Sequence, residues 1–87
     1  MSTTVVNKRS SSFDVYIGRG SIWGNPFVIG ADGTREDVIA KFETYFLSSE
    51  YLQSQVGELA GKRLGCFCAP LACHGDVLAR YAEEARS

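Results

Sequence analysis

The chain's three cysteines and its single histidine fall within nine consecutive positions, at Cys66, Cys68, Cys73 and His74. Thiolates and imidazole bind zinc, and they also serve as nucleophiles and proton carriers in enzymes. The stretch starts in an apolar run that is typical of a strand and continues into a pattern typical of a helix that begins near Gly75. This corner could therefore bind a metal, catalyse a reaction or position a helix.

A zinc ion would accept three thiolates and one imidazole, and it would help to stabilise a chain of 87 residues. The spacing disfavours such a site, because paired zinc ligands are normally separated by about two to four residues. Cys66 and Cys68 are separated by one residue and Cys73 and His74 by none, so neighbouring side chains would point apart on a regular element. A zinc-stabilised interaction module that uses these four ligands is an alternative, and no cofactor is expected.

Cys73 and His74 are the catalytic candidates. Cys73 lies just ahead of the expected helix, whose dipole would stabilise a thiolate, and His74 could hold or move a proton. They would suit a small hydrolase or an enzyme that cleaves a glycosyl bond in a nucleotide-like substrate. Successive residues rarely form a nucleophilic pair, so His74 alone, as an acid, a base or a ligand-binding group, is an equal alternative. A purely structural use of all four side chains also remains open.

A second unusual stretch, residues 18–27, contains three glycines, a proline and an asparagine. Its first part supplies converging backbone N–H groups, a guanidinium and a hydroxyl, which are the parts of a phosphate or carboxylate cradle. Its second part offers the flat faces of Trp23 and Phe27 and the amide of Asn25. These features suit a ligand that is charged at one end and flat at the other, such as a nucleotide.

Neither the dinucleotide-binding fingerprint nor the Walker pattern is present. The alternative is a tight structural loop in which Trp23 and Phe27 fill the core and Arg19 pairs with a carboxylate such as Asp14 or Asp76. A helix that begins near residue 75 would add N–H groups that attract anions. The expected ligand-binding residues are Gly18, Arg19, Gly20, Ser21, Trp23, Asn25, His74 and Gly75.

The elements that would position these residues follow one another in the order β-β-α-α-β-α. Residues 3–6, 13–17 and 64–68 are rich in β-branched, aromatic or apolar side chains and are expected to be strands. Thr34 to Asp37 has the form of a capping box and predicts the start of a helix. A break at Ser48 and Ser49 separates this helix from a second one that ends at Gly61. The last helix is expected over residues 75–84.

The sequence therefore predicts a single α/β domain, residues 1–87, with a small mixed or parallel three-stranded sheet and about three helices. A strand, a helical crossover and another strand normally run parallel. If the second and third strands are neighbours, the 18–27 loop and the cysteine and histidine corner meet at the carboxyl edge of the sheet, where open α/β folds bind ligands. The first two strands could instead form a hairpin.

The composition of the chain indicates which classes of binding partner are expected. Nine Lys and Arg against ten Asp and Glu give a net charge of −1, which disfavours nucleic acid as a partner. No apolar run is long enough to span a membrane and no signal peptide is evident, so a cytoplasmic protein is expected. The short chain favours a homo-oligomer. An odd number of cysteines makes a disulfide framework unexpected.

Two motifs together resemble a known family. Residues 15–27 carry Gly-Arg and Trp-Gly-Asn-Pro-Phe, and residues 61–78 carry Cys-Phe-Cys and Cys-His-Gly. They are similar to the small family called domain of unknown function 4326, which is frequent in bacteriophage genomes and also found in bacteria. Gly20 and Phe67 depart from the proline and tryptophan common in that family. A short likeness to domain of unknown function 488, around the Cys-His pair, supports the same topology.

The resemblance implies a phage context, and hence the cytoplasm of a bacterial host. Together with the residues, it leads to the hypothesis that the protein binds a phosphate-bearing, nucleotide-derived small molecule and thereby sequesters a nucleotide signal. The enzyme and the zinc module described above are the alternatives.

Overall fold

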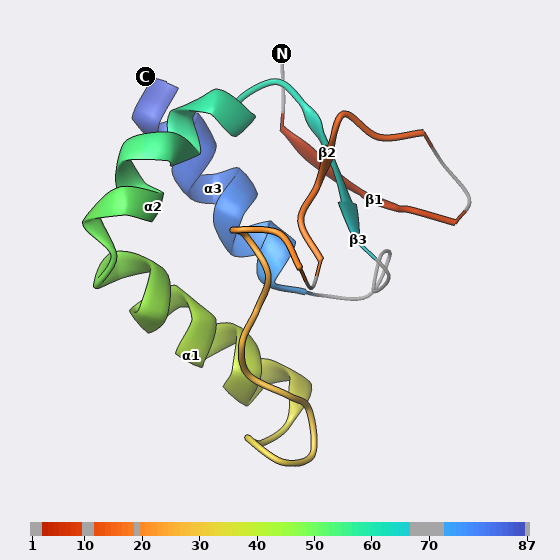
Figure 1. The fold of residues 1–87 in the computed structure, drawn as a ribbon, viewed down its shortest axis with the longest axis vertical. Helices are drawn as coiled ribbons and strands as arrows, with labels where there is room; N and C mark the ends of the chain where they lie inside the picture. The colour runs from red at the N-terminus through yellow and green to blue at the C-terminus, as the bar shows by residue number, and fades with distance from the viewer. Residues whose placement is uncertain (1–2, 10–11, 19, 67–72, 87) are drawn as a thin grey trace.

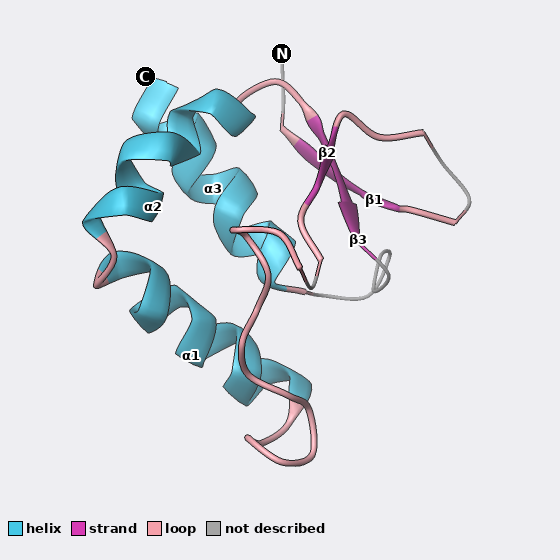
Figure 2. Cartoon of the chain, viewed as in Figure 1, coloured by secondary structure: helices cyan, strands magenta, loops and turns pink. Residues whose placement is uncertain are grey.

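The computed structural model describes residues 3–9, 12–18, 20–66 and 73–86. In these ranges the elements follow the expected order and confirm the α/β fold (Figure 1, Figure 2). They are β1 (Thr4–Asn7), β2 (Val15–Tyr16), α1 (Arg35–Leu47), α2 (Glu50–Gln55), the short 3-10 helix η1 (Val56–Leu59), β3 (Arg63–Cys66) and α3 (His74–Arg86).

The three strands form one parallel sheet in the order β1-β3-β2. Strand β3 is therefore central, with Val5 of β1 and Val15 of β2 both in register with Leu64. The first two strands lie on opposite sides of β3, which excludes a hairpin between them. On the face opposite to the Leu64 side chain, the ring of Phe13 packs on Gly65, where a Cβ atom would come within 2.6 Å of it.

The three α-helices lie on one side of the sheet, and α3 lies between the sheet and the other two (Figure 1). The core forms in this space, where Ile17, Phe42, Leu64 and Leu78 are fully buried. Gly75 lets the start of α3 approach the sheet closely, because a Cβ atom there would lie 2.7 Å from Cδ1 of Ile17. The first turn of α3 is thereby held against the carboxyl edge of the sheet.

The helix boundaries follow from local capping. The Asp37 N–H donates to Thr34 Oγ1 at 3.2 Å and the Thr34 N–H donates to Asp37 Oδ2 at 2.9 Å, which confirms the predicted capping box. Ser49 caps α2 by accepting the Leu52 N–H at 3.2 Å. The α-helical part ends earlier than predicted, at residue 55, since η1 tightens into a 3-10 turn before Gly61, which has a φ of 76°.

Candidate functional site

The carboxyl ends of the three parallel strands share one edge of the sheet, and the segments that follow them meet there. Strand β1 leads to Lys8 and Arg9, β2 leads into the 18–27 loop, and β3 leads, through residues outside the described part, to α3. Nε2 of His74 lies 2.7 Å from the Ile17 carbonyl oxygen at the end of β2. His74 also forms a hydrogen bond with the backbone of Trp23, so the predicted meeting of the 18–27 loop with the Cys73 and His74 corner is confirmed.

His74 fastens the start of α3 to the segment after β2. The side chain is 9% exposed, and its ring meets that of Phe42 edge-on with centroids 5.0 Å apart. Burial lowers its pKa, against the raising effect of hydrogen bonds to the backbone of Ile17 and Trp23 and of the charge of Asp76. The imidazole is therefore neutral at pH 7, and it is engaged in hydrogen bonds with the protein backbone. This is the structural use of His74 that the sequence left open.

Cys73 acts as the N-cap of α3. Its Sγ accepts the Gly75 N–H at 3.3 Å, and Oδ2 of Asp76 accepts the Cys73 N–H at 3.1 Å, as the acidic side chain of a capping box does. The sulfur also lies 3.3 Å from Sγ of Cys66. Burial, followed by the hydrogen bond with Cys66, raises the pKa of Cys73 to about 12. The thiol is protonated at pH 7, which disfavours it as a nucleophile in this arrangement.

Two backbone N–H groups at the start of α3 already have hydrogen-bond acceptors within the protein. The Gly75 N–H bonds to the Cys73 sulfur and the Asp76 N–H bonds to the Cys73 carbonyl oxygen at 3.0 Å. The carboxylate of Asp76 already lies at the positive end of the helix. A bound anion therefore competes with Asp76 here, and the predicted ligand role of Gly75 stays a prediction.

The 18–27 loop begins with two successive turns. The Ser21 N–H and hydroxyl both donate to the Gly18 carbonyl oxygen, at 3.2 Å and 2.7 Å, and the Gly24 N–H donates to Ser21 O at 3.2 Å. Gly20 has a φ of 93° and is exposed, so it supplies the left-handed backbone that the first turn requires. Gly18 lies under Tyr16, whose hydroxyl would be 2.4 Å from an added Cβ. Arg19, the predicted anion ligand, lies outside the described residues.

Trp23 and Asn25 have structural roles. Trp23 is 5% exposed and belongs to the hydrophobic core, as the structural alternative for this loop expects. The amide of Asn25 donates to the Val38 carbonyl oxygen at 3.2 Å and accepts the Phe27 N–H at 2.9 Å, so it ties the loop to α1. Contact of either side chain with a ligand stays a prediction. In this conformation the ring of Trp23 is buried and the amide of Asn25 is engaged in these two hydrogen bonds.

The metal ligands proposed from sequence are brought together only in part. Cys66 and Cys73 are in contact, whereas the Nε2 atom of His74 is occupied by the Ile17 carbonyl oxygen and Cys68 is not among the described residues. Within the described ranges, no group of three His, Cys, Asp or Glu side chains is arranged to hold a metal ion. With Nε2 engaged by that carbonyl, only Nδ1 of His74 would be left to bind zinc in this arrangement.

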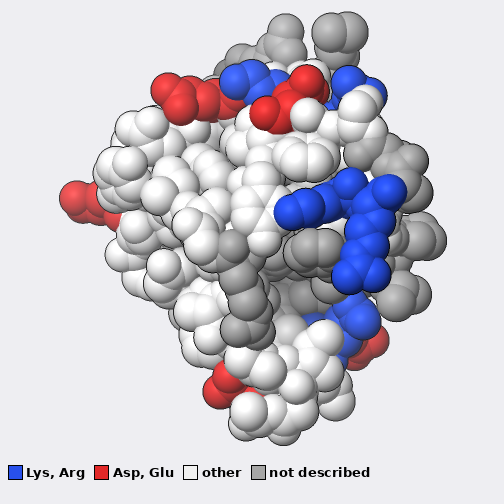
Figure 3. All heavy atoms as spheres, turned by 45° about the vertical axis from the view of Figure 1, so that its right-hand side comes forward, with Lys and Arg blue, Asp and Glu red and all other residues white. Residues whose placement is uncertain are grey.

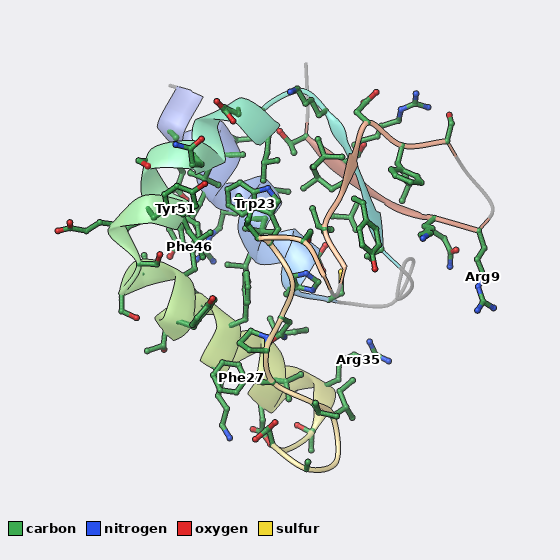
Figure 4. The ribbon with its side chains drawn as sticks, viewed as in Figure 1. Arg9, Trp23, Phe27, Arg35, Phe46 and Tyr51 are labelled. Atoms are coloured by element: carbon green, nitrogen blue, oxygen red, sulfur yellow. The ribbon has the colours of Figure 1, made fainter. Side chains whose placement is uncertain are left out.

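Basic side chains that the sequence did not assign to the site lie at the same edge. Lys8 and Arg9 are exposed in the turn after β1, and Nζ of Lys8 lies 4.6 Å from the centre of the Tyr16 ring. Figure 4 places Arg9 beyond β1 and Arg35 at the start of α1, both on the side to which the strands point. In Figure 3 the Lys and Arg side chains gather on this face, and the acidic side chains in view lie towards its margins.

The fold and the site together define a small all-parallel α/β domain with a basic carboxyl edge. In the described ranges, no helix is long and apolar enough to cross a membrane. Residues 3–84 match the family described as domain of unknown function 4326. The chain belongs to this family, which confirms the resemblance carried by the two motifs.

Two curated relatives are viral proteins. An uncharacterised 12.4 kDa protein encoded between nrdA and td in Enterobacteria phage T4 is 46% identical over 85 residues, which cover 92% of this chain and 77% of the relative. An uncharacterised protein of Acanthamoeba polyphaga mimivirus is 37% identical over an alignment of 83 residues, and the match covers 75% of this chain and 63% of the relative. The match thus spans less than two thirds of the mimivirus protein's length. No solved structure matches the chain.

Proposed function

We propose that the protein binds a phosphate-bearing, nucleotide-derived small molecule at the carboxyl edge of its sheet. The observation that carries this proposal is the convergence of three parallel strand ends, one followed by Lys8 and Arg9 and another by the glycine-rich loop. Parallel α/β sheets bind ligands at this edge, because the backbone there can present N–H groups and variable side chains. The viral relatives suggest a role in sequestering a nucleotide signal in the cytoplasm of an infected host.

The charges of the described residues favour one part of this edge for the phosphate. The carboxylate of Asp76 occupies the start of α3, so the phosphate is expected nearer to Lys8 and Arg9. The exposed backbone at Gly20 and the guanidinium of Arg19 would complete the cradle. Because Trp23 is buried, the flat part of the ligand is expected to contact the half-buried ring of Tyr16. The ammonium group of Lys8 already lies over this ring.

The test is a calorimetric titration of the full chain with nucleoside mono-, di- and triphosphates, cyclic nucleotides and ADP-ribose. The double variant Lys8→Gln/Arg9→Gln removes two charges from the proposed phosphate site. Lys62→Gln is the control for a lost surface charge elsewhere, because Lys62 is exposed at the amino end of β3, the opposite edge of the sheet. One charge-assisted hydrogen bond contributes about 1.5–3 kcal/mol, so the double variant should bind at least about tenfold more weakly.

Each outcome of the titration has a different meaning for the proposed function. If no member of the panel binds, or if the control weakens binding as much as the double variant, the proposal is wrong. Recovery of the ligand after denaturation of the protein separates binding from catalysis. Intact ligand supports a binding protein, whereas products would instead establish an enzyme.

A further inference from the structure

Two buried thiols are in contact where the central strand and α3 come together. Cys66 ends β3 and Cys73 precedes α3, and their side chains are 2% and 3% exposed. Their Sγ atoms are 3.3 Å apart, and both cysteines are free. A disulfide bond is about 2.05 Å long, so an approach of about 1.2 Å would join the two sulfurs. The proposed binding of a nucleotide uses neither of them.

We propose that Cys66 and Cys73 form a reversible intrachain disulfide by exchange with a small-molecule disulfide. One cysteine, as its thiolate, attacks the small disulfide, whose S–S bond breaks, and the first small thiol leaves with the proton that the cysteine lost. The second cysteine then attacks the protein sulfur of this mixed disulfide and releases the second small thiol with its own proton. The pair loses two electrons, and the small disulfide is reduced to two thiols.

The neighbouring donor atoms favour a disulfide over a metal site for this pair. The Nε2 atom of His74 bonds to a backbone carbonyl oxygen, and Oδ2 of Asp76 accepts the Cys73 N–H. Among the described residues, no third His, Cys, Asp or Glu side chain joins the two sulfurs in an arrangement that could hold a metal ion, and the sulfurs are in contact with each other. The Gly75 N–H that bonds to Sγ of Cys73 can stay in place when the S–S bond forms, because the sulfur keeps acceptor lone pairs.

The surroundings of the pair also predict how it reacts. Both sulfurs are shielded from solvent, and Cys73 is held as a thiol by burial. The first step therefore requires the start of α3 to open locally, so oxidation is slow compared with that of an exposed dithiol. Once closed, the bond would link the end of β3 to the N-cap of α3, two of the segments that form the edge described above.

The experiment uses three full-chain variants. Cys68→Ser keeps the pair and removes the third thiol, whereas Cys66→Ala and Cys73→Ala, each made in the Cys68→Ser chain, remove one partner of the pair. Each protein is equilibrated anaerobically in glutathione buffers of increasing disulfide content, quenched with acid, unfolded and alkylated. Mass spectrometry then counts the free thiols. The Cys68→Ser protein should pass from two alkylated cysteines to none in one two-electron transition, and reduction with dithiothreitol should reverse it. The other two variants each keep a single cysteine and are the controls for glutathione adducts, which add mass to the protein without closing an intrachain bond.

The wild-type chain provides a test that does not depend on the folding of a variant. Free thiols in the oxidised protein are labelled with a light reagent, and the thiols recovered by reduction are labelled with its heavy isotope. The proposal expects heavy label at both Cys66 and Cys73, and a disulfide-linked peptide that joins them in the oxidised protein. Persistent light label at Cys66 and Cys73, a linked peptide that joins either of them to Cys68, glutathione adducts without ring closure, or a stoichiometric metal bound by these thiols in the isolated protein would each overturn it.

Discussion

Replacing Gly75 with alanine tests the close contact between α3 and the carboxyl edge of the sheet. An added Cβ would lie 2.7 Å from Cδ1 of Ile17 and 3.1 Å from both Cγ atoms of Val5. The Ile17 side chain is fully buried and cannot turn into solvent. The new methyl group must therefore push the start of α3 away from the sheet, and His74, which bonds to the Ile17 carbonyl oxygen, must move with it.

Two opposing effects set the magnitude. Overpacking a core contact by one methyl group costs about 1–3 kcal/mol. Replacing a helical glycine with alanine contributes up to about 1 kcal/mol in the other direction. The variant Gly57→Ala gains the second effect without the first, because an added Cβ at Gly57 would meet only Cβ of Ala85 at 3.9 Å, which is an ordinary contact. The difference in stability between the two variants therefore isolates the cost of overpacking. We therefore expect Gly75→Ala to be about 1–3 kcal/mol less stable than Gly57→Ala.

Denaturant unfolding monitored by circular dichroism measures this difference, and for a chain of this size it corresponds to a shift in Tm of about 4–8 °C for each kcal/mol. The midpoint should fall for Gly75→Ala and stay the same or rise for Gly57→Ala. Equal stability of the two variants would mean that α3 does not approach the sheet as closely as described. The position of His74 at the site would then lose its support.

Two further predictions concern the walls of the site. Asn25→Ala should lower the free energy of unfolding by about 1–3 kcal/mol, because it removes the hydrogen bonds to Val38 and Phe27, and a melting curve unchanged from that of the wild type would contradict the structural role of this amide. Burial lowers the pKa of His74 in the folded protein, so the unfolded chain takes up the proton first and stability should fall as the pH drops from about 7 to about 5.5. His74 is the chain's one histidine, so His74→Gln should flatten this dependence, and a wild-type stability that does not change over the same window would refute the assignment.

Features with a local cause could be predicted from the sequence. The Thr34 and Asp37 box depends on four successive residues, and it lies where expected. The meeting of the 18–27 loop with His74 followed from strand order and the rule for parallel crossovers, and the hydrogen bond between His74 and the backbone of Trp23 confirms it. The hairpin alternative is wrong because both early strands pair with β3, in which Leu64 is in register with Val5 and Val15, and not with each other.

Features that depend on distant partners could not be predicted in this way. Asn25 has the chemistry to read a base, and nothing around it in sequence indicates that the Val38 carbonyl oxygen satisfies its amide. Lys8 and Arg9 appear in the sequence as an ordinary polar turn, and they join the site only because β1 is the other neighbour of β3. The expected homo-oligomer likewise stays a prediction, since it concerns contacts between chains.

Native mass spectrometry of the full chain, mixed with the panel of phosphate-bearing nucleotides, tests the central claim most directly. We predict that at least one compound adds to the protein at one molecule per chain and is recovered intact. The addition should be lost in Lys8→Gln/Arg9→Gln and kept in Lys62→Gln, and the same spectrum reports the number of subunits. A chain that binds no member of the panel, or that binds equally well without Lys8 and Arg9, would contradict the assignment of this edge as a nucleotide site.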